Sequence, residues 1–432
     1  MTLNFSYATF QRKKYLYIFL FTILFATSYL IGYKSLSSSN NFKNLTVHQE
    51  KYLTYLPHDG FNNQRIELEN AIFLAWFLNR TLIIPPLLFF KGVAPIISQP
   101  YDELYNILKR FMLPNDDYKK NEFEFCFSEY KTNCNFVLCL REDQSNCRTV
   151  SYTMYNWEEL MDFTFLKQNI KYIHRQDFNY KHLLESIQIY DDKEVYNMTN
   201  DQSQYQQRYY DDPRSTKSLG KFKERVNLID LSKRNEKLLH FGSVFSSIRI
   251  DQELPESKKF WKKLMNEMIP NNPIIINIVN KIVDKIGGTN NFIGAHARLK
   301  DGYFARNQNK TIKELIKKIQ IDFKQINIKN DSTCLPTIIY LATDVKHNHK
   351  SLQPFFQTFP CVYTLNDFND LLEPLKFLKN PKDDMIMYEF FIPLVDLLVT
   401  SRGNRFYQTP RSTFSRYAQQ LNKVNFTKSI IF

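Results

Sequence analysis

Apolar and polar positions in the first part of the chain follow the order strand, helix, strand. Large apolar residues at 52–56 (YLTYL) predict a buried strand, and the polar segment HDGFNNQR at 58–65 predicts a turn. Apolar residues at helical spacing over 66–78 then predict a helix, and TLII at 81–84 predicts a second strand that prolines end. Because this is the order of a βαβ unit, we expect a parallel sheet.

The same alternation returns near residue 255 and continues to the end of the chain. The expected helices are at 261–268, 274–286, 311–323 and 412–421, and the expected strands are at 291–295, 337–342 and 394–400. The chain is therefore assigned to the α/β class. Its two halves, at 51–253 and 254–432, predict two Rossmann-like domains that face a cleft. Open α/β sheets bind ligands at such a cleft, beside the carboxyl ends of their strands.

Two segments lack this regular pattern. Residues 201–225 are polar without an apolar period, so we expect an exposed loop or an excursion between domains. Residues 116–148 contain charges and most of the cysteines. The six cysteines are Cys126, Cys134, Cys139, Cys147, Cys334 and Cys361. An even number predicts disulfides in an oxidising compartment, paired within the first four and within the last two. A zinc site is the alternative for the first four, but they contain no CxxC pair.

An uncharged segment at 15–33 lies near the N-terminus. At about 1.5 Å per residue it just spans a hydrocarbon core of about 30 Å. Lys13 and Lys14 precede it, and basic flanks favour the cytosolic side. We therefore expect a type II anchor in the Golgi or endoplasmic reticulum membrane, with 1–14 cytosolic and 34–50 a luminal stem. A buried core helix is the alternative, against which the polar tract after the segment argues.

The charge of the chain narrows the class of partner. Its 432 residues carry 57 Lys and Arg against 44 Asp and Glu, a net charge of +13. Such a charge favours anionic partners. The basic residues are dispersed, however, and form neither zinc-finger spacing nor an RNA-recognition signature. Nucleic acid is therefore a poor candidate, and a nucleoside-diphosphate sugar fits the charge better.

Three polar loops follow predicted strands and are suited to bind a phosphate. In HDGFNNQR, Gly60 allows a tight turn, and the N–H groups of the following helix start favour phosphate. In HARLKD at 296–301, His296 and Arg298 point the same way if the segment is extended. In RSTFSR at 411–416, hydroxyls lie at a helix start. Each loop also has a plain structural alternative: a turn, a basic surface stretch and a serine N-cap.

Together, and in this order, the three loops resemble the GDP-fucose O-fucosyltransferase family. HDGFNNQR with the helix and LIIPP strand after it is similar to the family's N-terminal nucleotide-sugar loop. HARLKD is similar to its H-x-R element, and RSTFSRY to its C-terminal S-T-F-S element. The resemblance extends over about 52–420. It implies a GT-B-like fold with GDP-fucose in the cleft, mainly on the C-terminal domain, and inverting transfer that needs no metal or other cofactor.

The resemblance also implies roles for individual residues. Arg298 is expected to stabilise the departing β-phosphate. Asp59 occupies the place where transferases of the thrombospondin-repeat type carry a glutamate as general base, and an Asx-turn role is its alternative. The acidic residue that the family carries upstream of its last strand matches either Glu389 or Asp396. The expected substrate-binding residues are Gly60, Phe61, Asn62, Asn63, His296, Ala297, Asp344, Ser412, Thr413 and Phe414.

The sequence also departs from the family's pattern. Asn63 and Gln64 match other branches better than the thrombospondin-repeat branch, and 404–411 is an insertion between the last expected strand and the S-T-F-S element. Other donors, such as UDP-rhamnose, therefore stay open, as does a catalytically inactive luminal binding protein of the same fold. The expected partners are the donor, a protein or glycan acceptor, and the membrane.

Overall fold

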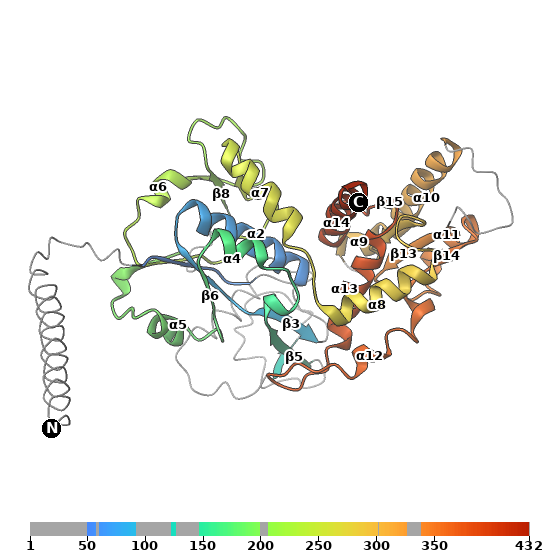
Figure 1. Ribbon diagram of the computed structural model, residues 1–432, viewed down its shortest axis with the longest axis horizontal. Helices are drawn as coiled ribbons and strands as arrows, with labels where there is room; N and C mark the ends of the chain where they lie inside the picture. The colour runs from blue at the N-terminus through green and yellow to red at the C-terminus, as the bar shows by residue number, and fades with distance from the viewer. Residues whose placement is uncertain are drawn as a thin grey trace, which may run out of the picture. The chain divides into compact units, whose positions relative to one another are not determined.

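The computed structural model describes residues 50–57, 60–91, 122–126, 147–198, 206–300, 302–325 and 338–431. Residues from Glu50 onward form one compact unit (Figure 1). The expected cytosolic tail, membrane segment and nearly all of the stem lie outside the described residues. Within the described ranges, no helix has the length and apolar composition needed to span a bilayer.

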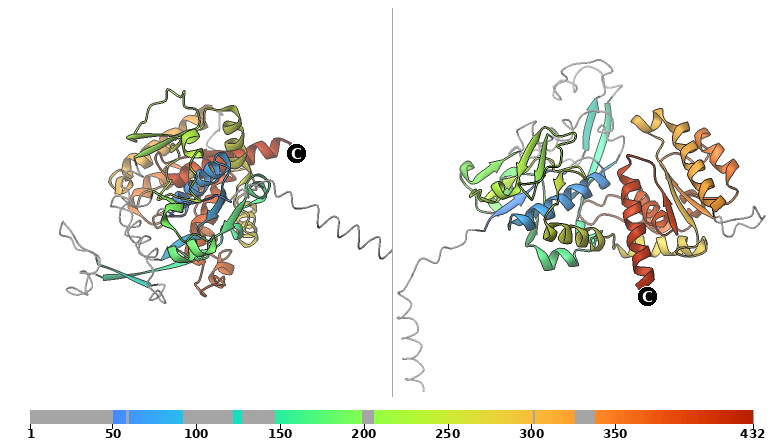
Figure 2. Two further views of the ribbon diagram at one scale, coloured as in Figure 1. Left: turned by 90° about the vertical axis from the view of Figure 1, so that its left-hand side faces the viewer. Right: turned by 90° about the horizontal axis from the view of Figure 1, so that it is seen from above.

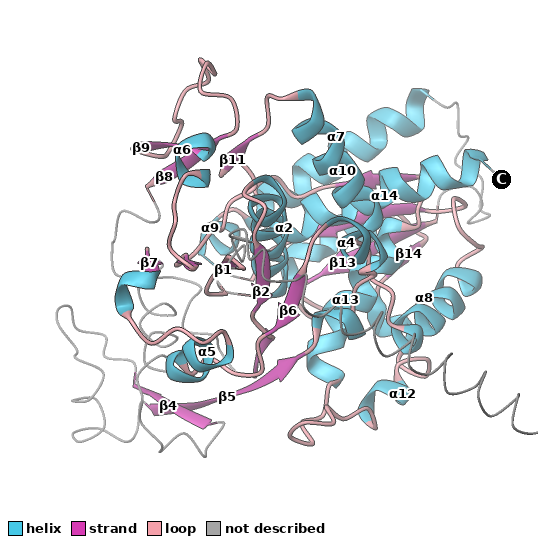
Figure 3. Cartoon of the chain, turned by 60° about the vertical axis from the view of Figure 1, so that its left-hand side comes forward, coloured by secondary structure: helices cyan, strands magenta, loops and turns pink. Residues whose placement is uncertain are grey.

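The first half is built on a five-stranded sheet in which every neighbouring pair is parallel. Its strands, magenta in Figure 3, lie in the order β6-β2-β1-β10-β7. They are β1 (Tyr52–Thr54), β2 (Thr81–Ile84), β6 (Tyr172–His174), β7 (Val195–Asn197) and β10 (Leu238–His240). The predicted parallel sheet is confirmed, and β1 and β2 fall within the predicted segments.

Helix α2 (Phe61–Phe77) connects β1 to β2 and is buried along twelve consecutive residues, Gln64–Ala75. Two of its buried polar side chains, Gln64 and Asn70, bond backbone groups. Gln64 exchanges hydrogen bonds with the N–H and C=O of Leu88, at 2.9 and 2.7 Å. Asn70 donates to the carbonyls of Val244 and Ser246. The helix starts at Phe61, so the prediction of a turn over all of 58–65 was wrong. The first helical turn contains polar residues such as Gln64 that are themselves buried, so no pattern of apolar residues marked it as helical.

Two further helices pack on α2. In α7 (Pro255–Glu267), Phe260 stacks on Trp76 with ring centroids 4.3 Å apart, and it also contacts Phe165 of α4 (Thr164–Asn169). Helix α14 (Thr413–Ile431), red in Figures 1 and 2, lies beside α2 and α7. The helices expected at 261–268 and 412–421 are thereby confirmed. The domain division at 253/254 stays a prediction, although α7 contacts helices of the first half.

The second half contains a four-stranded parallel sheet in the order β14-β13-β12-β15. Helices α10 and α11 pack on one face through residues such as Ile312 and Phe355. On the other face, Tyr340 and Phe292 belong to the same apolar cluster as α8 and α13. The elements are α8 (Pro273–Lys285), β12 (Ile293–Ala297), α10 (Gln308–Gln325), β13 (Ile339–Thr343), α11 (Gln353–Thr358), β14 (Val362–Tyr363), α13 (Tyr388–Ser401) and β15 (Arg405–Tyr407).

The strand expected at 394–400 is wrong, because these residues lie in helix α13. Nearly all of them are buried, so no polar face marks the helical period. The strand at this edge of the sheet is β15, with a largely exposed Arg405 and half-buried aromatic residues. The segment 404–411, interpreted as an insertion, therefore contains the last strand of the sheet.

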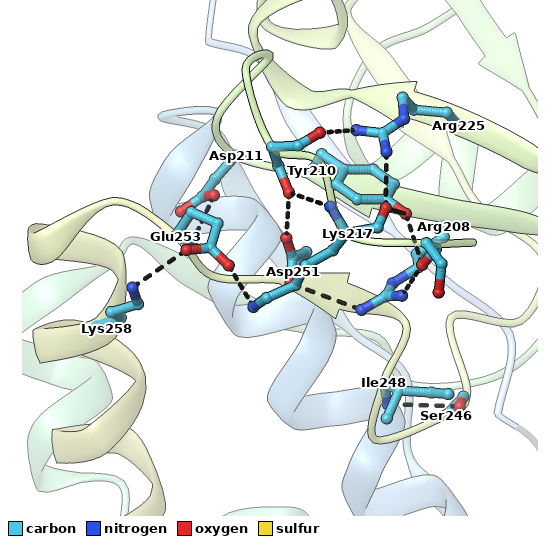
Figure 4. Close-up of polar contacts among 12 residues, drawn as sticks. Arg208, Tyr210, Asp211, Lys217, Arg225, Ser246, Ile248, Asp251, Glu253 and Lys258 are labelled. Atoms are coloured by element: carbon cyan, nitrogen blue, oxygen red, sulfur yellow. Dashed lines mark hydrogen bonds and ion pairs between the residues drawn. The ribbon is translucent and has the colours of Figure 1, made fainter. Parts of the chain in front are cut away.

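The expectation of an irregular loop at 201–225 is also wrong in part. A small sheet in the order β11-β8-β9 buries Tyr209 and Tyr210. Its strands are β8 (Gln207–Tyr210), β9 (Glu224–Asn227) and β11 (Ile250–Asp251). The loop between β8 and β9 is held by charges: Asp251 accepts from Lys217 at 2.8 Å and from Ser215 at 2.9 Å (Figure 4). Two apolar residues in a polar stretch are too few to show a strand period.

A further sheet is antiparallel and has the order β3-β5-β4, with β3 (Leu87–Lys91), β4 (Glu122–Cys126) and β5 (Cys147–Tyr155). Its register sets Cys126 opposite Cys147. Cys361 is disulfide-bonded. Its predicted pairing with Cys334 stays a prediction, since Cys334 lies outside the described residues. The remaining helices are α5 (Tyr180–Ser186), α6 (Leu228–Ser232), α9 (Gly302–Arg306) and α12 (Glu373–Lys376).

Gly294 on β12 allows helix α13 to approach the second sheet. A Cβ atom at this position would overlap the carbonyl oxygen of Thr400, which is backbone and cannot swing away. We expect Gly294→Ala to lower the free energy of unfolding by about 3 kcal/mol, measured by urea denaturation. Gly60→Ala is the control, because a Cβ there meets nothing within 4 Å. Equal stability of the two variants would contradict this account.

Candidate functional site

The order of the strands marks one edge of each sheet as a place for a ligand. In the second sheet the chain runs from β12 outward to β13 and β14, and then returns to place β15 on the other side of β12. All pairs of this sheet are parallel, so the carboxyl ends of its strands lie along one edge, and open α/β sheets bind ligands outside that edge. The first sheet is parallel as well, and the carboxyl ends of its central strands β1 and β10 lie side by side at Thr54 and His240. The predicted site residues lie at the carboxyl end of β12 or follow β1, β12, β13 and β15.

His296, on β12, is buried and held from both sides. Its Nδ1 atom lies 2.6 Å from the Ser415 hydroxyl, and its ring stacks on Phe414 with centroids 4.3 Å apart. Ser415 Oγ also accepts the Thr409 N–H at 3.0 Å, and we assign its own hydrogen to Nδ1, which places the hydrogen of a neutral ring on Nε2. Burial, with the nearby Arg298 charge, lowers the pKa of His296 to about 3. The ring is therefore neutral, and its Nε2–H is a donor.

Arg298 follows β12 on a backbone that is fixed at several points. Its N–H donates to the Thr409 hydroxyl at 3.2 Å, and its guanidinium lies 5.0 Å from the centre of the Phe304 ring. Asp344, at the end of β13, accepts the N–H groups of Leu299 at 2.7 Å and Lys300 at 3.3 Å. The carboxylate of Asp344 therefore positions the loop behind Arg298. A guanidinium held in this way is suited to bind a diphosphate.

Ser412 begins the last helix as its N-cap. Its hydroxyl accepts the Ser415 N–H at 3.3 Å, and its carbonyl accepts the Arg416 N–H at 3.1 Å. The serine-cap interpretation of this motif is therefore confirmed. Thr413 and Phe414 lie in the first turn, and backbone N–H groups of a first turn have no partner inside the helix. The first turn of α14 thus lies against His296, through the Phe414 ring and the Ser415 hydroxyl.

The residues predicted in the first half lie at the start of α2. Gly60 is its N-cap, with φ −73°, and its carbonyl accepts the N–H groups of Asn63 and Gln64. Phe61 packs on Trp157, with centroids 5.9 Å apart. The buried Oδ1 of Asn62 has no hydrogen-bond partner in the described part of the chain, so it is available to a hydroxyl donor. Asp59 lies outside the described residues.

The predicted site residues of the second half contact one another directly, and helices α14 and α2 connect them to the first half. The Arg65 guanidinium of α2 lies 3.7 Å from the centre of the Tyr417 ring of α14 and pairs with Glu69. Arg416 of α14 bonds the Ser247 hydroxyl in the loop after β10. Ala297, by contrast, packs in the apolar cluster beneath α10.

Sequence reasoning missed two hydroxyls of this site. Ser415 is the last letter of the S-T-F-S element, so its proximity to His296 could have been predicted from the motif. Thr409 has no such signal, because it follows a strand that was not predicted.

Asp396 and Glu389, left open as alternatives, differ in position. Glu389 is exposed in the first turn of α13. Asp396 is buried and accepts the Tyr340 hydroxyl at 2.7 Å. Burial raises the pKa of Asp396 to about 7, with a smaller upward contribution from the Asp344 charge. Asp396 is therefore the carboxyl that lies near the Arg298 loop.

This raised pKa predicts a pH-dependent stability. The stabilisation from protonated Asp396 is complete below its ordinary pKa of 3.8 and is lost as the pH rises through about 7. Asparagine keeps the acceptor for Tyr340 and stays neutral. We expect Asp396→Asn to have a higher Tm than the wild type at pH 8, and a smaller difference at pH 5. If the difference in Tm between Asp396→Asn and the wild type were the same at both pH values, ionisation of Asp396 would not destabilise the fold.

Among the described residues, no group of three or more His, Cys, Asp or Glu side chains is placed to hold a metal ion.

The model of the GDP-fucose protein O-fucosyltransferase family matches residues 52–425. The chain belongs to this family. The match includes the three loops described above and all the strands of the two larger parallel sheets. It therefore agrees with the resemblance on which the site residues were predicted, while the role of each residue stays a prediction.

Individual relatives of this fucosyltransferase family member are distant or matched over a short stretch. O-fucosyltransferase 30 of Arabidopsis thaliana is 53% identical over 49 residues, which is 11% of this chain and 10% of that protein. The crystal structure of POFUT1 in complex with GDP is 12% identical, with a TM-score of 0.41, over 86% of this chain and 94% of that one. A mutant of Arabidopsis thaliana FUT1 in complex with GDP is 11% identical, with a TM-score of 0.39, over 90% and 72%.

Proposed function

We propose that this protein transfers fucose from GDP-fucose to a hydroxyl of a protein or glycan acceptor, with inversion and without a metal. The observation that carries the proposal is the arrangement of His296, Arg298 and the start of α14 at the edge of the second sheet. In a chain of this family, a neutral histidine donor beside a fixed guanidinium is suited to a nucleoside diphosphate.

The chemistry divides between leaving group and acceptor. As the bond from fucose C1 to the β-phosphate oxygen breaks, negative charge develops on the phosphate, and Arg298 stabilises it. Such electrostatic stabilisation contributes about 3–4 kcal/mol per group. The His296 Nε2–H and the first-turn N–H groups of α14 bind the rest of the nucleotide. None of these residues needs to accept a proton.

The acceptor hydroxyl attacks C1 from the opposite face, and its proton passes to a base. Asp59 is our candidate for this base, since it directly precedes the N-cap of α2. Asn62 orients a hydroxyl of the sugar through its buried Oδ1, which meets no partner among the described residues. We further propose that residues 15–33 anchor the protein in the Golgi or endoplasmic reticulum membrane with this site in the lumen.

The decisive experiment measures turnover by residues 43–432 against a panel of nucleotide sugars. We expect hydrolysis of GDP-fucose and binding of GDP. Turnover of UDP-rhamnose instead would show that the protein is a transferase with a donor other than GDP-fucose. Binding of GDP without turnover of any sugar would favour an inactive binding protein, and absence of all nucleotide binding would reject the proposal.

A further inference from the structure

A buried arginine and a buried histidine of the first half both contact the start of helix α5, away from the loops described so far. Arg175 follows β6 and is 6% exposed, and His240 ends β10 and is fully buried. Tyr180, the first residue of α5, contacts the His240 ring, with centroids 5.7 Å apart. We name Arg175, Tyr180 and His240 the Arg175 cluster.

The guanidinium of Arg175 is only partly satisfied. Nη2 donates to the carbonyl of Asn179 at 3.1 Å, whereas the buried Nε and Nη1 have no hydrogen-bond partner in the described ranges. Asp177 is close in sequence, but its oxygens accept from the Asn179 N–H at 2.9 Å and bond His182 Nδ1 at 2.7 Å. No carboxylate of the described residues forms an ion pair with Arg175.

His240 is unsatisfied at both ring nitrogens, which are buried and without hydrogen-bond partners in the same ranges. Burial, together with the charge of Arg175, lowers the pKa of His240 to about 3. The neutral ring therefore offers one N–H donor. The cluster combines this donor with the free N–H groups of a cation.

Another arginine shows how this fold satisfies a buried guanidinium that is only structural. Arg80 is 4% exposed, and its nitrogens donate to the carbonyls of Tyr52, Arg234, Glu236 and Lys237. Burial lowers the pKa of Arg80 and of Arg175 alike, to about 10. The two arginines thus share burial but not partners. The Arg175 guanidinium lies 5.7 Å from the centre of the Phe178 ring and near the Asp177 charge, but it has no hydrogen-bonded anion in the described ranges. A buried charge without such a partner is unfavourable, so an added anion would stabilise Arg175 more than Arg80.

We propose that the Arg175 cluster binds one oxyanion group, a carboxylate, phosphate or sulfate. The guanidinium supplies charge, and its N–H groups with that of His240 supply donors. His240 lies opposite Thr54, at the carboxyl ends of the central strands β10 and β1, and α/β sheets bind ligands outside such strand ends. Two sources fit this chemistry: a free inorganic ion or an acidic group of the acceptor. The second source rests on the proposed transferase function.

The test measures thermal unfolding of residues 43–432 as the anion concentration rises at constant ionic strength. Sulfate, phosphate, acetate and glucuronate are compared with chloride. We expect a saturable rise in Tm of roughly 2 °C or more for an oxyanion. Arg175→Met should abolish this rise, and should itself be as stable as the wild type without anion, because it removes the unpaired charge.

Arg80→Met is the matched control: it should lower the Tm and, where it folds, keep the anion response. If Arg175→Met does not fold, His240→Phe replaces it, since phenylalanine keeps the ring contact and removes both nitrogens. Saturation by sulfate or phosphate alone assigns a free ion, and saturation by acetate and glucuronate assigns an acceptor carboxylate. A rise in Tm that is linear in anion concentration, or that is unchanged in Arg175→Met, would overturn the proposal. The buried nitrogens of the cluster would then be assigned to bonds with buried water. No nucleotide sugar is present, so the outcome is independent of transferase activity.

Discussion

Arg298→Ala is expected to lower the kcat of fucose transfer by about 100- to 1,000-fold, which corresponds to the loss of one electrostatic contact with the leaving group. The KM for GDP-fucose should rise less, because the charge on the phosphate is larger in the transition state than in the bound donor. Steady-state kinetics over a range of donor concentrations would separate the two constants. Arg298→Lys should recover part of the rate, since it keeps the charge but not the fork.

The matched control for this variant is Arg306→Ala. Arg306 is exposed in α9, a few residues further along the chain. It should retain the wild-type kcat, and both variants should retain the wild-type Tm. A wild-type kcat in Arg298→Ala would remove this residue from the reaction.

Glu69→Leu is expected to lower the free energy of unfolding by about 3–5 kcal/mol, because it leaves the buried Arg65 without its partner. Arg65 and Glu69 are both almost fully buried in α2. Leucine supplies apolar bulk but no acceptor. Urea denaturation followed by circular dichroism would measure the loss.

The double variant Arg65→Met/Glu69→Leu separates charge from packing. Removal of both charges should restore most of the stability, since methionine still packs on the Tyr417 ring. If the double variant is less stable than Glu69→Leu, the guanidinium stabilises the fold through Tyr417 rather than through Glu69.

Segments with one polar face could be predicted from the sequence. The helices around Ile278 and Leu315 show clear periods, and the structure places them as expected. The strand at 81–84 is buried at every residue and was predicted from its β-branched and aliphatic residues and the prolines after it. Periodicity failed where the surroundings hide it. Helix α13 is buried on nearly every side, and in α2 polar residues such as Asn70 are buried with backbone partners.

The site was predictable as a set of loops but not as a set of contacts. The motifs gave His296 and Arg298, while the hydroxyl of Thr409 that joins their backbones became visible only with strand β15 in place. The distinction between Asp396 and Glu389 also required the fold, because both lie on one helix and only burial separates them. The Arg175 cluster has no motif at all.

Helix α7 covers aromatic residues of α2, and this packing determines how the chain can be cut into fragments. One side of the helix meets the first sheet, and Trp76 and Phe73 meet Phe260 of α7. Residues just after α7 stay tied to the first half, where the N–H of Asn271 donates to the carbonyl of Leu160. Fragments made by cutting at 253/254 would each carry an uncovered aromatic surface. Such fragments are suited to split-protein complementation rather than to separate expression, because each is the natural cover of the other.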